Sequence, residues 1–582
     1  MITTIKTKTT KSILSIVSVM TLLFSMGSCQ DYLDVLPEDK LVGEQMYRDV
    51  NDADAAVIGI YGKLMGLAEK YVILNEMRAD LMSTTANSSP YLKQLSDHNE
   101  TSENPYVSPK DFYEVIQNCN DALHNFDIML AEKRLKQAEY NHRYADVACI
   151  RSWVYLQLGV QYGTIPYITE PIETLEDVKN SAKYPRIPFN QLIDKLVDFT
   201  EALTFKKPYP EGANLRTTVD GYSTEYFFIN KECLLGDLNL WKGDYTKAAS
   251  YYKNVLETAT GAASSEYLYA KYRLSWSTSD IMVAYLSGRS SDVNALINNE
   301  TQGWRSIFSR PYDATWTYEW IWSLPFSSSF APKNPFIAFF SKTSGDYLAK
   351  PSQSAMNLWN NQTQLNGFPY DARGSKYTYK MVGGEPVIMK YLYKYEAAAD
   401  PFKTDGDWFL YRAAKLHLRY AEAANRDNQH RLAEAIYNNE GVRRAYLPAG
   451  VNTSSDDVTN LMQTHLPYPY NFDAREGQFP YYRGDWYRSS LGVRGRAYLV
   501  KKEVVGDSLI SIENNIIEEA ALELAYEGNR WEDLVRVARR RKDPSFLADK
   551  IYAKLSAEGN ANAEDVRAKL MNPNNWYLPF NW

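Results

Sequence analysis

The sequence predicts a mainly helical protein, in which helical hairpins form a scaffold and a loop-rich region with short strands decorates it. Three observations lead to this fold class. Residues 229–256 have the pattern of two helices joined by one short turn, and several other segments carry the same helical spacing of apolar residues. Residues 258–405 are instead dense in Gly, Ser, Asn and Pro. About four helical pairs are expected along the chain.

The hairpin expected over residues 229–256 resembles one unit of a tetratricopeptide (TPR) repeat. The residues that match repeat positions are Leu235, Gly236, Gly243, Asp244, Tyr245, Ala248 and Tyr252. Gly236 and Ala248 carry almost no side chain, so two helix axes can approach closely there, while Gly243 and Asp244 supply the turn. Small residues recur at many close helix crossings, so an unrelated helical hairpin is the alternative interpretation.

Apolar residues at helical spacing predict further helices along the chain. The predicted helices cover residues 51–67, 109–130, 140–162, 189–203, 408–425, 431–444 and 515–540. The last is expected to be one continuous helix, because apolar or small residues recur in it at alternating steps of four and three. Residues 83–110 are rich in Ser, Thr, Asn and Pro and are expected to form an exposed loop.

The composition is that of a folded protein that does not bind nucleic acid. Charged residues make up 23% and apolar residues 45% of the chain, which are ordinary values for a globular protein. The net charge is −7, and no basic stripe is available to neutralise phosphates. The 45 Tyr residues are the unusual entry in this composition, since Tyr offers both a flat apolar face and a polar rim. Such residues suit either a binding surface or half-buried positions between helices.

The first 28 residues have the layout of an export signal. Three lysines precede an apolar run over residues 13–24, and two small residues precede Cys29. The apolar run is shorter than the ~20 residues that span a bilayer as a helix. A cysteine in this place resembles the acylated first residue of a bacterial lipoprotein, so Cys29 is the predicted lipidation site; ordinary secretion with a free thiol is the alternative. Residues 29–582 are expected to form one domain, with a ligand-binding insertion at about 258–405.

No catalytic, metal-binding or cofactor-binding motif stands out. The six histidines form no H-x-x-x-H pair, and the chain lacks a G-x-S-x-G motif and a P-loop. Cys119, Cys149 and Cys233 have no metal-ligand spacing and are expected to be buried free thiols. Accordingly, we expect no catalytic residues, no metal site and no cofactor.

Three glutamates, Glu519, Glu523 and Glu527, lie four residues apart in the last predicted helix. Two carboxylates on one helix can suggest the acid pair of a glycosidase. Arg530 lies three residues after Glu527, however, and Arg536 lies four after a further glutamate, so ion pairing is the simpler interpretation.

Aromatic residues flanked by loop-forming residues are the predicted ligand contacts. These candidates are Tyr91, Trp276, Trp304 and Trp359. A ring held by a rigid scaffold can stack on the apolar face of a ligand. A second set of rings alternates along a predicted strand, at Trp316, Tyr318, Trp320 and Trp322. This row would lie on one face of the strand, either as a ligand platform or, as rows of aromatics more often do, in the core.

Several segments, spread over the whole chain, resemble the SusD/RagB family of nutrient-binding outer-membrane lipoproteins. The segments are Cys29 with the following Asp31-Tyr-Leu-Asp34, residues 151–156 leading into Tyr162-Gly-Thr-Ile-Pro166, residues 419–423, residues 442–445, residues 523–536, and the closing Trp576-Tyr-Leu-Pro579. The family's terminal motif normally continues with Ile-Pro, whereas Phe580 and Asn581 stand here. Residues 258–405 match poorly, as expected where loops vary and bind.

The resemblance implies a TPR-like scaffold, a lipid anchor in the outer membrane that faces the cell surface, and a lid-like partnership with a SusC-like TonB-dependent barrel transporter. The predicted function is therefore capture of a glycan and its delivery to that transporter, without catalysis. Three alternatives stay open. The ligand is an oligopeptide, the protein is a helical glycoside hydrolase or lyase, or it is a TPR-like scaffold whose ligand is another protein.

Overall fold

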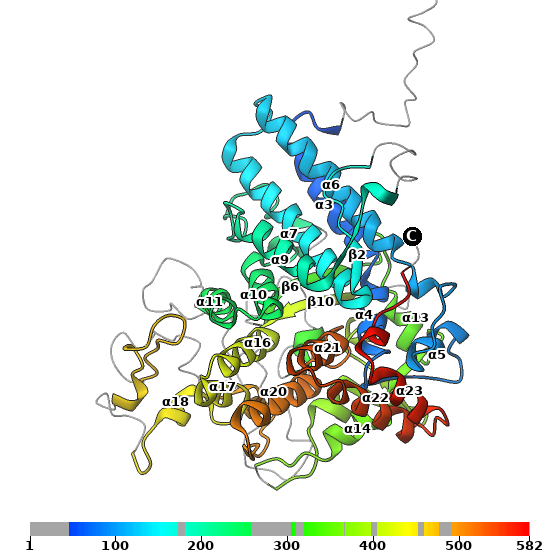
Figure 1. Cartoon of the computed structure of the whole chain (residues 1–582), viewed down its shortest axis with the longest axis vertical. Coiled ribbons are helices and arrows are strands. Elements are labelled where there is room, and N and C mark those ends of the chain that lie inside the picture. The colour runs from blue at the N-terminus through cyan, green and yellow to red at the C-terminus, as the bar shows by residue number, and fades with distance from the viewer. Residues whose placement is uncertain are drawn as a thin grey trace, which may run out of the picture.

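In the computed structural model of the protein, helices dominate, and early helices lie beside C-terminal ones (Figure 1). The residues that the structure describes are 46–172, 181–219, 222–257, 304–309, 319–365, 367–396, 404–451, 459–475 and 491–580. The predicted signal segment, Cys29 and Trp276 lie outside these residues.

The N-terminal part of the scaffold is a set of packed helices. They are α3 (Val50–Met65), α4 (Ala68–Glu76), α5 (Pro90–Ser96), α6 (Lys110–Ala131), α7 (Gln137–Tyr162) and α9 (Phe189–Glu201). The Asp49 side chain caps α3 by accepting from the backbone N–H groups of Asn51 and Asp52. α6 and α7 pack against each other at one end of the molecule (Figure 1). The four predicted helices of this part are confirmed, but the predicted loop at 83–110 contains α5.

The TPR-like hairpin is confirmed as α10 (Lys231–Lys242) and α11 (Tyr245–Leu256). A Cβ on Gly236 would lie 2.3 Å from the Tyr252 ring, so only glycine permits this helix crossing. Gly243 ends α10 in the left-handed region at φ +90°, and the Asp244 side chain then accepts from the Lys247 N–H to cap α11.

The C-terminal part adds further helical pairs. Its main helices are α16 (Ala413–Arg426), α17 (His430–Tyr437), α18 (Gly441–Tyr446), α20 (Ser508–Leu524), α21 (Arg530–Arg541), α22 (Ser545–Ala557) and α23 (Ala563–Leu570). Shorter ones are α12 (Ser306–Ser309), α13 (Phe336–Phe340), α14 (Gln353–Asn360), α15 (Tyr393–Glu396) and α19 (Val493–Arg496). α16 packs on α17, and α22 on α23, while the early helices α4 and α5 lie beside the C-terminal ones (Figure 1). The scaffold of TPR-like helical pairs is thus confirmed.

The prediction of one continuous helix over residues 515–540 is wrong. The chain leaves the helix at Ala525, where ψ is +136°, and α21 begins only at Arg530. Gly528 lies between them in the left-handed region at φ +81°. The Glu76 carboxyl group, far away in the sequence, accepts from the N–H groups of Gly528 (2.8 Å) and Asn529 (3.1 Å). These contacts satisfy the backbone N–H groups of the turn. The apolar spacing of the segment does not reveal that a turn is there.

The described strands pair in antiparallel twos. The pairs are β1 (Met82–Thr84) with β7 (Ala349–Pro351), β2 (Thr164–Pro166) with β3 (Arg186–Pro188), β4 (Thr218–Val219) with β5 (Tyr222–Ser223), β6 (Trp320–Phe326) with β10 (Gly406–Arg412), and β8 (Tyr379–Val382) with β9 (Glu385–Ile388). β6 and β10 are buried along their whole length. Trp320 and Trp322 are therefore core residues, as the second interpretation of the aromatic row predicts, whereas Trp316 and Tyr318 lie outside the described residues.

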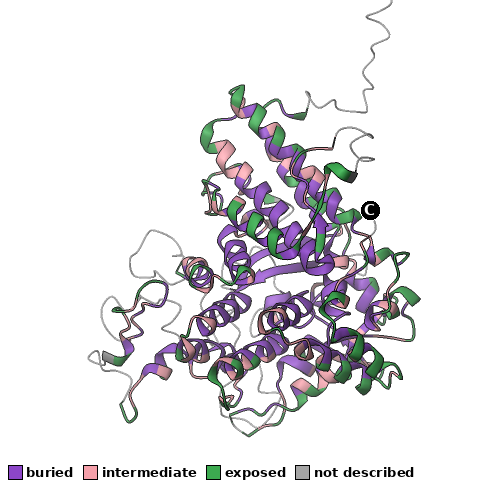
Figure 2. Ribbon diagram, viewed as in Figure 1, coloured by how far each residue is buried: buried purple, intermediate pink, exposed green. Residues whose placement is uncertain are grey.

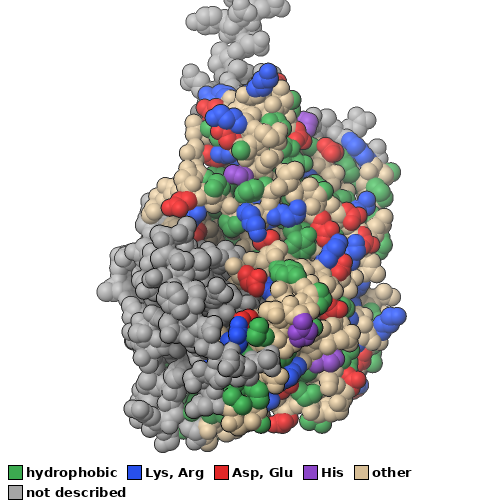
Figure 3. All heavy atoms as spheres, turned by 90° about the vertical axis from the view of Figure 1, so that its left-hand side faces the viewer, with side chains coloured by type: hydrophobic (Ala, Val, Ile, Leu, Met, Phe, Trp, Pro, Cys, Tyr) green, Lys and Arg blue, Asp and Glu red, His purple; other side chains and the backbone are tan. Residues whose placement is uncertain are grey.

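Buried apolar side chains from all these elements form one contiguous core, and the buried segments run through the middle of the molecule (Figure 2). Cys119, Cys149 and Cys233 are buried free thiols in it, as predicted. On the face shown in Figure 3, acidic and basic side chains of the described residues are interspersed. In the described residues, no helix is both long and apolar enough to cross a membrane.

Candidate ligand-binding surface

Of the four predicted ligand contacts, Tyr91 is the one whose ring the structure places at the surface. It lies in the first turn of α5 and is 41% exposed. Ser89 caps this helix by accepting from the Leu92 N–H, and Pro90 occupies the first helical turn. Leu92 and Leu95 are buried and anchor the opposite face of α5. The local sequence thus fixes α5 and leaves the Tyr91 ring turned toward solvent.

The loop before α5 is attached to a segment about 260 residues further along the chain. β1 pairs with β7, with Thr84 opposite Ala349. Beyond the strands, the Ser88 hydroxyl donates to the carbonyl of Leu348 (2.6 Å), and the Asn87 amide donates to the carbonyl of Asp346 (2.9 Å). The segment just before Tyr91 is therefore held by hydrogen bonds to this distant segment rather than by loop conformation alone.

The partner segment brings polar side chains to the same region. Asp346 and Lys342 are exposed, and the Lys342 ammonium donates to the carbonyl of Gly383 (3.2 Å) in the turn between β8 and β9. Tyr347 is buried and donates from its hydroxyl to the carbonyl of Pro386 (2.8 Å). We define the candidate ligand-binding surface as Asn87, Tyr91, Lys342 and Asp346. It offers one ring face with an amide, an ammonium and a carboxylate, a set suited to a polar ligand with apolar faces.

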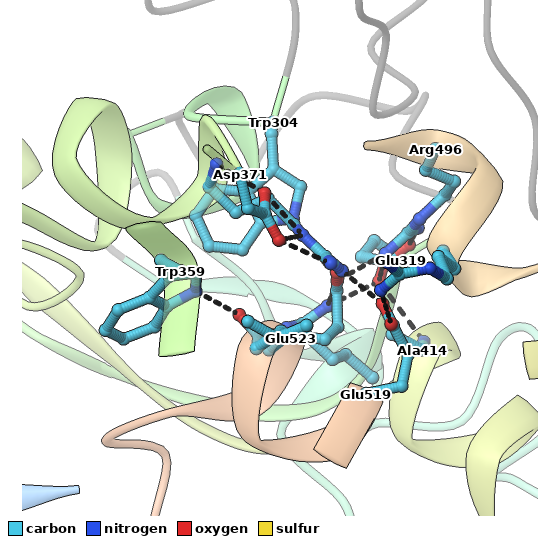
Figure 4. A network of polar contacts seen from close by, with 12 residues as sticks. Trp304, Glu319, Trp359, Asp371, Ala414, Arg496, Glu519 and Glu523 are labelled. Atoms are coloured by element: carbon cyan, nitrogen blue, oxygen red, sulfur yellow. Dashed lines mark hydrogen bonds and ion pairs between the residues drawn. The ribbon is translucent and has the colours of Figure 1, made fainter. Parts of the chain in front are cut away.

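The predictions for Trp304 and Trp359 are wrong, because both rings belong to the core. Trp304 is 0% and Trp359 1% exposed. The Trp304 indole N–H donates to the Glu523 carboxylate (3.2 Å), and the Trp359 indole N–H donates to the carbonyl of Leu522 (3.1 Å). Both rings thus pack on α20 (Figure 4). Loop-forming neighbours in the sequence do not tell whether a ring points outward or into the core.

The two tryptophans cover a buried network of charges (Figure 4). Its carboxylates are Glu319, Asp371, Glu519, Glu523 and Glu527, and its cations are Arg373, Lys390, Arg412, Arg494 and Arg496. The Glu523 carboxylate accepts from Arg412 (2.8 Å), from Arg373 (2.6 Å) and from Arg496. Each buried charge therefore has an opposite charge beside it, which is the condition for keeping ions out of water.

The electrostatics of this network are those of buried charges that stabilise one another. Burial raises the pKa of the Glu523 carboxyl, but Arg496, Arg412 and Arg373 outweigh burial and hold that pKa well below its usual range. Burial lowers the pKa of the Lys390 ammonium to about 8. Because the glutamates of α20 are buried and paired, the ion-pair interpretation of the glutamate row is confirmed.

The partners within that interpretation differ in part from the predicted ones. Arg530 pairs with Asp80 (2.6 Å) rather than with Glu527, whereas Arg536 does lie 3.6 Å from Glu532.

Among the described residues, no group of three or more His, Cys, Asp or Glu side chains is arranged to hold a metal ion. Sequence reasoning missed Asn87, Lys342 and Asp346, since the segment with Lys342 and Asp346 is brought to the loop before α5 only by the pairing of β1 with β7 and by the Asn87–Asp346 hydrogen bond.

The protein is a helical protein of the TPR-like class. Its Tyr91 side chain is exposed on an edge that hydrogen bonds hold in place. Comparison with known proteins then identifies the family. Residues 31–205 match the family described as "Starch-binding associating with outer membrane", and residues 309–580 match the SusD family. The chain belongs to the SusD family.

Individual relatives are distant. The chain is 26% identical to SusD-like protein P38 of Formosa agariphila over 189 residues, which are 31% of this chain and 35% of that protein. It is 28% identical to SusD-like protein P25 of the same organism over 175 residues, 27% of this chain and 32% of that protein. These matched regions thus span about a third of each relative's length.

Solved structures show the same fold over most of the chain. A SusD superfamily protein from Bacteroides vulgatus is similar with a TM-score of 0.56 and 15% identity, covering 92% of this chain and 96% of that one. The surface glycan-binding protein A from Bacteroides uniformis gives a TM-score of 0.55 at 15% identity, with 91% and 96% covered. A laminarin-binding SusD-like protein gives 0.52 at 15% identity, with 87% and 94% covered.

Proposed function

We propose that the protein is a cell-surface lipoprotein that captures a glycan on the surface around Tyr91 and delivers it to a TonB-dependent outer-membrane transporter. The observation that carries this proposal is the exposed Tyr91 ring, held on a rigid edge in a chain of the SusD family. Structurally similar proteins include a laminarin-binding and a surface glycan-binding protein, which favours a glycan over other ligands.

The physical case for Tyr91 is that its ring loses little freedom on binding. A tyrosine side chain has few rotamers, and α5 is fixed by its cap and its buried leucines. Contact energy made by a pre-organised ring therefore survives largely as affinity. Alanine in place of a true contact ring costs about 1–3 kcal/mol of binding free energy.

The anchor and the transporter belong to the same proposal. Cys29 would carry the lipid chains, and several chains hold a protein on a membrane far more firmly than one. A tethered binder without chemistry of its own needs a route across the membrane for its ligand, which a SusC-like barrel supplies. Cys29→Ala should release the protein from the membrane fraction, and mild detergent should extract the wild type together with a barrel protein.

The decisive experiment is a screen of the soluble domain against glycans and oligopeptides, followed by isothermal titration of the best ligand. Tyr91→Ala should weaken the dissociation constant roughly 5- to 150-fold. Tyr552→Ala is the matched control, because Tyr552 is a similarly exposed tyrosine (37%) on α22. It should bind like the wild type, and both variants should keep the wild-type melting temperature. Trp276→Ala tests the remaining predicted contact.

Each alternative has its own outcome in this screen. Binding of peptides but not glycans would assign an oligopeptide ligand, and shortened glycans after overnight incubation would reveal an enzyme. Retention of neither class would favour a protein-binding scaffold. If Tyr91→Ala and Tyr552→Ala bind a glycan equally well, the glycan function stands but its site is not the one around Tyr91.

A further inference from the structure

A second surface feature lies away from Tyr91, where α10, α11 and α21 meet. It is a cleft of about 450 Å³, with side chains that include Trp241, Lys242, Tyr245, Arg539, Arg540 and Lys542. We call it the α21 cleft. Its lining combines two half-buried aromatic rings with several basic side chains. None of these residues belongs to the surface around Tyr91 or to the buried network under Trp304.

The basic side chains on the buried side of the α21 cleft are neutralised from behind. Arg536 binds Glu422 through two hydrogen bonds of 2.8 and 2.7 Å. Arg540 donates to the same carboxylate (2.8 Å) and also binds Glu513. These pairs explain why arginines occur there without any ligand, and they fix the wall of the cleft in place.

Arg539 and Lys542, in contrast, have no carboxylate of the described residues paired with them. Arg539 donates to the Asn190 side-chain oxygen (2.7 Å) and to the Tyr577 hydroxyl, which are neutral, and lies over the Phe189 ring at 4.8 Å. Lys542 is exposed and forms no ion pair with a carboxylate of the described residues. Basic residues in a last helical turn do favour the helix dipole. Here they also leave two cations lining an open cleft.

The wall of the α21 cleft contains arginine N–H groups without a hydrogen-bond partner in the described part of the chain. Among the described residues, Nη1 of Arg536 and both Nε and Nη1 of Arg540 are buried without a hydrogen-bond partner. Burying an unpaired donor is costly, so such atoms need an explanation. Both arginines line the α21 cleft, but these N–H groups are buried, and Nη1 of Arg536 lies 3.6 Å from the Glu532 carboxylate, so they belong to the wall of the cleft rather than to its open side.

The Trp241 ring and the backbone of Tyr245 are held in place in the α21 cleft. The Trp241 indole N–H donates to the Glu532 carboxylate (3.3 Å), and its ring meets the Phe189 ring edge-on at 5.0 Å. Tyr245 follows the Gly243 turn and opens α11, where the cap formed by Asp244 fixes its backbone. A fixed ring beside a guanidinium group suits a flat ligand that carries an anionic group.

We propose that the α21 cleft binds an anionic saccharide unit, a sugar that carries a sulfate or carboxylate group. The anion would face Arg539 and Lys542, and the sugar ring would face Trp241 and Tyr245. This inference rests on the proposed glycan-binding function. It adds a second subsite that distinguishes anionic from neutral saccharides. The volume fits one or two sugar units, whereas a bare inorganic anion would leave the aromatic side of the cleft unused.

The test uses saccharide probes that differ only in charge. Sulfated maltotetraose is compared with maltotetraose, and tetragalacturonate with its methyl ester, by isothermal titration in 20 mM NaCl. Lys542→Asn removes one charge and keeps a residue that tolerates the left-handed conformation at φ +54°. Lys133→Asn is the matched control, since Lys133 is also an exposed lysine at φ +62° beyond the end of a helix. Arg539→Gln is paired with Arg567→Gln, since Arg567 on α23 is likewise a half-buried arginine.

We expect at least one charged probe to bind at least tenfold more tightly than its neutral counterpart. Lys542→Asn and Arg539→Gln should each weaken that binding fivefold or more, while the two control variants stay within twofold of the wild type. Raising NaCl to 300 mM should weaken it as well, because exposed charges are screened. The source of the anion is decided by whether the sulfated or the carboxylated probe binds.

Several results would overturn the inference. These are equal binding of charged and neutral probes, equal loss in the target and control variants, and tighter binding of an octaglutamate peptide, which would assign an acidic protein segment instead. Neutral-glycan binding that depends on Tyr91 should be unchanged in Lys542→Asn. Its persistence, when charged probes fail, would leave the proposed function standing, and loss of binding to every saccharide would overturn both.

Discussion

Two glycine-containing turns of this protein connect helices in similar ways, yet only one of them is visible in the sequence. Gly243 between α10 and α11 has φ +90°, and Gly528 between α20 and α21 has φ +81°. A local TPR-like signature in the sequence predicts the first turn. The second lies inside what the apolar spacing predicts as one continuous helix.

The two turns differ in how far along the chain the hydrogen-bond acceptor lies that caps each following helix or turn. Asp244 follows Gly243 directly and caps α11 through the Lys247 N–H. The N–H groups of Gly528 and Asn529 are satisfied by Glu76, which is about 450 residues away on α4. A cap supplied by a neighbour leaves a sequence pattern, and a cap supplied by another helix leaves none. The following changes test this contrast, starting from the largest expected effect.

Gly528→Leu should be the most damaging of these substitutions. A Cβ at Gly528 would lie 2.3 Å from the Tyr71 ring, and φ +81° is unfavourable for any branched side chain. Overlap and strain together should lower the free energy of unfolding by about 4 kcal/mol or more. Chemical denaturation measures this value.

Gly559→Leu separates the two causes. Gly559 has φ +72°, but a Cβ there meets no atom within 4 Å. This control should lose only the strain contribution, about 1–2 kcal/mol. Equal losses in the two variants would show that Tyr71 does not confine Gly528, and hence that the turn is not packed against α4.

Trp531→Ala should cost about 3–5 kcal/mol of unfolding free energy, because it removes a large buried ring directly after the second turn. Trp531 is 0% exposed, with the Arg78 guanidinium 4.2 Å above its ring and His98 beside it. Trp531→Phe keeps most of this volume and should lose clearly less. A loss below about 0.5 kcal/mol for the alanine variant would place α21 outside the core.

Glu76→Ala should cost about 2–3 kcal/mol, since it leaves the buried N–H groups of Gly528 and Asn529 without an acceptor. Glu76→Gln offers the same acceptor oxygen and should be far milder at pH 6. The comparison of the two variants by urea denaturation tests whether the remote cap holds the second turn. Similar losses in both would mean that the carboxyl group itself, which both variants lack, matters rather than the acceptor oxygen that Gln keeps.

Glu76 also makes stability depend on pH. Burial raises the pKa of the Glu76 carboxyl to about 8 in the folded protein, against about 4.3 in an unfolded chain. Between these values the folded state binds more protons than the unfolded state, so the free energy of unfolding falls as pH rises. Glu76→Gln lacks this dependence and should gain more than about 1 kcal/mol relative to the wild type from pH 5 to pH 8. Parallel stability curves would contradict a raised pKa.

The same contrast between near and distant partners explains how much the sequence predicts. Helices with local caps and clear apolar spacing, such as α3, α7 and α10, are found from the sequence, and so is the family. Of the candidate ligand-binding surface, only Tyr91 is found, since Asn87 and Asp346 meet through the pairing of β1 with β7. Trp304 and Trp359 are misjudged because their partners on α20, Glu523 and Leu522, are more than 160 residues away.

Asp244→Ala should have the smallest effect, because it removes a single local cap at a half-exposed helix start. The Asp244 carboxylate accepts one hydrogen bond, from the Lys247 N–H at 3.3 Å. Losing such a cap costs about 1 kcal/mol, since water can replace the acceptor. Asp244→Ser keeps an acceptor in place and should stay within a few tenths of a kcal/mol of the wild type. Urea denaturation of both variants and of Glu76→Ala then shows which of the two caps contributes more to the free energy of unfolding. If Asp244→Ala lowers the free energy of unfolding as much as Glu76→Ala, the local cap is not the weaker of the two. Whether a turn can be predicted from the sequence would then be unrelated to how much its cap stabilises the protein.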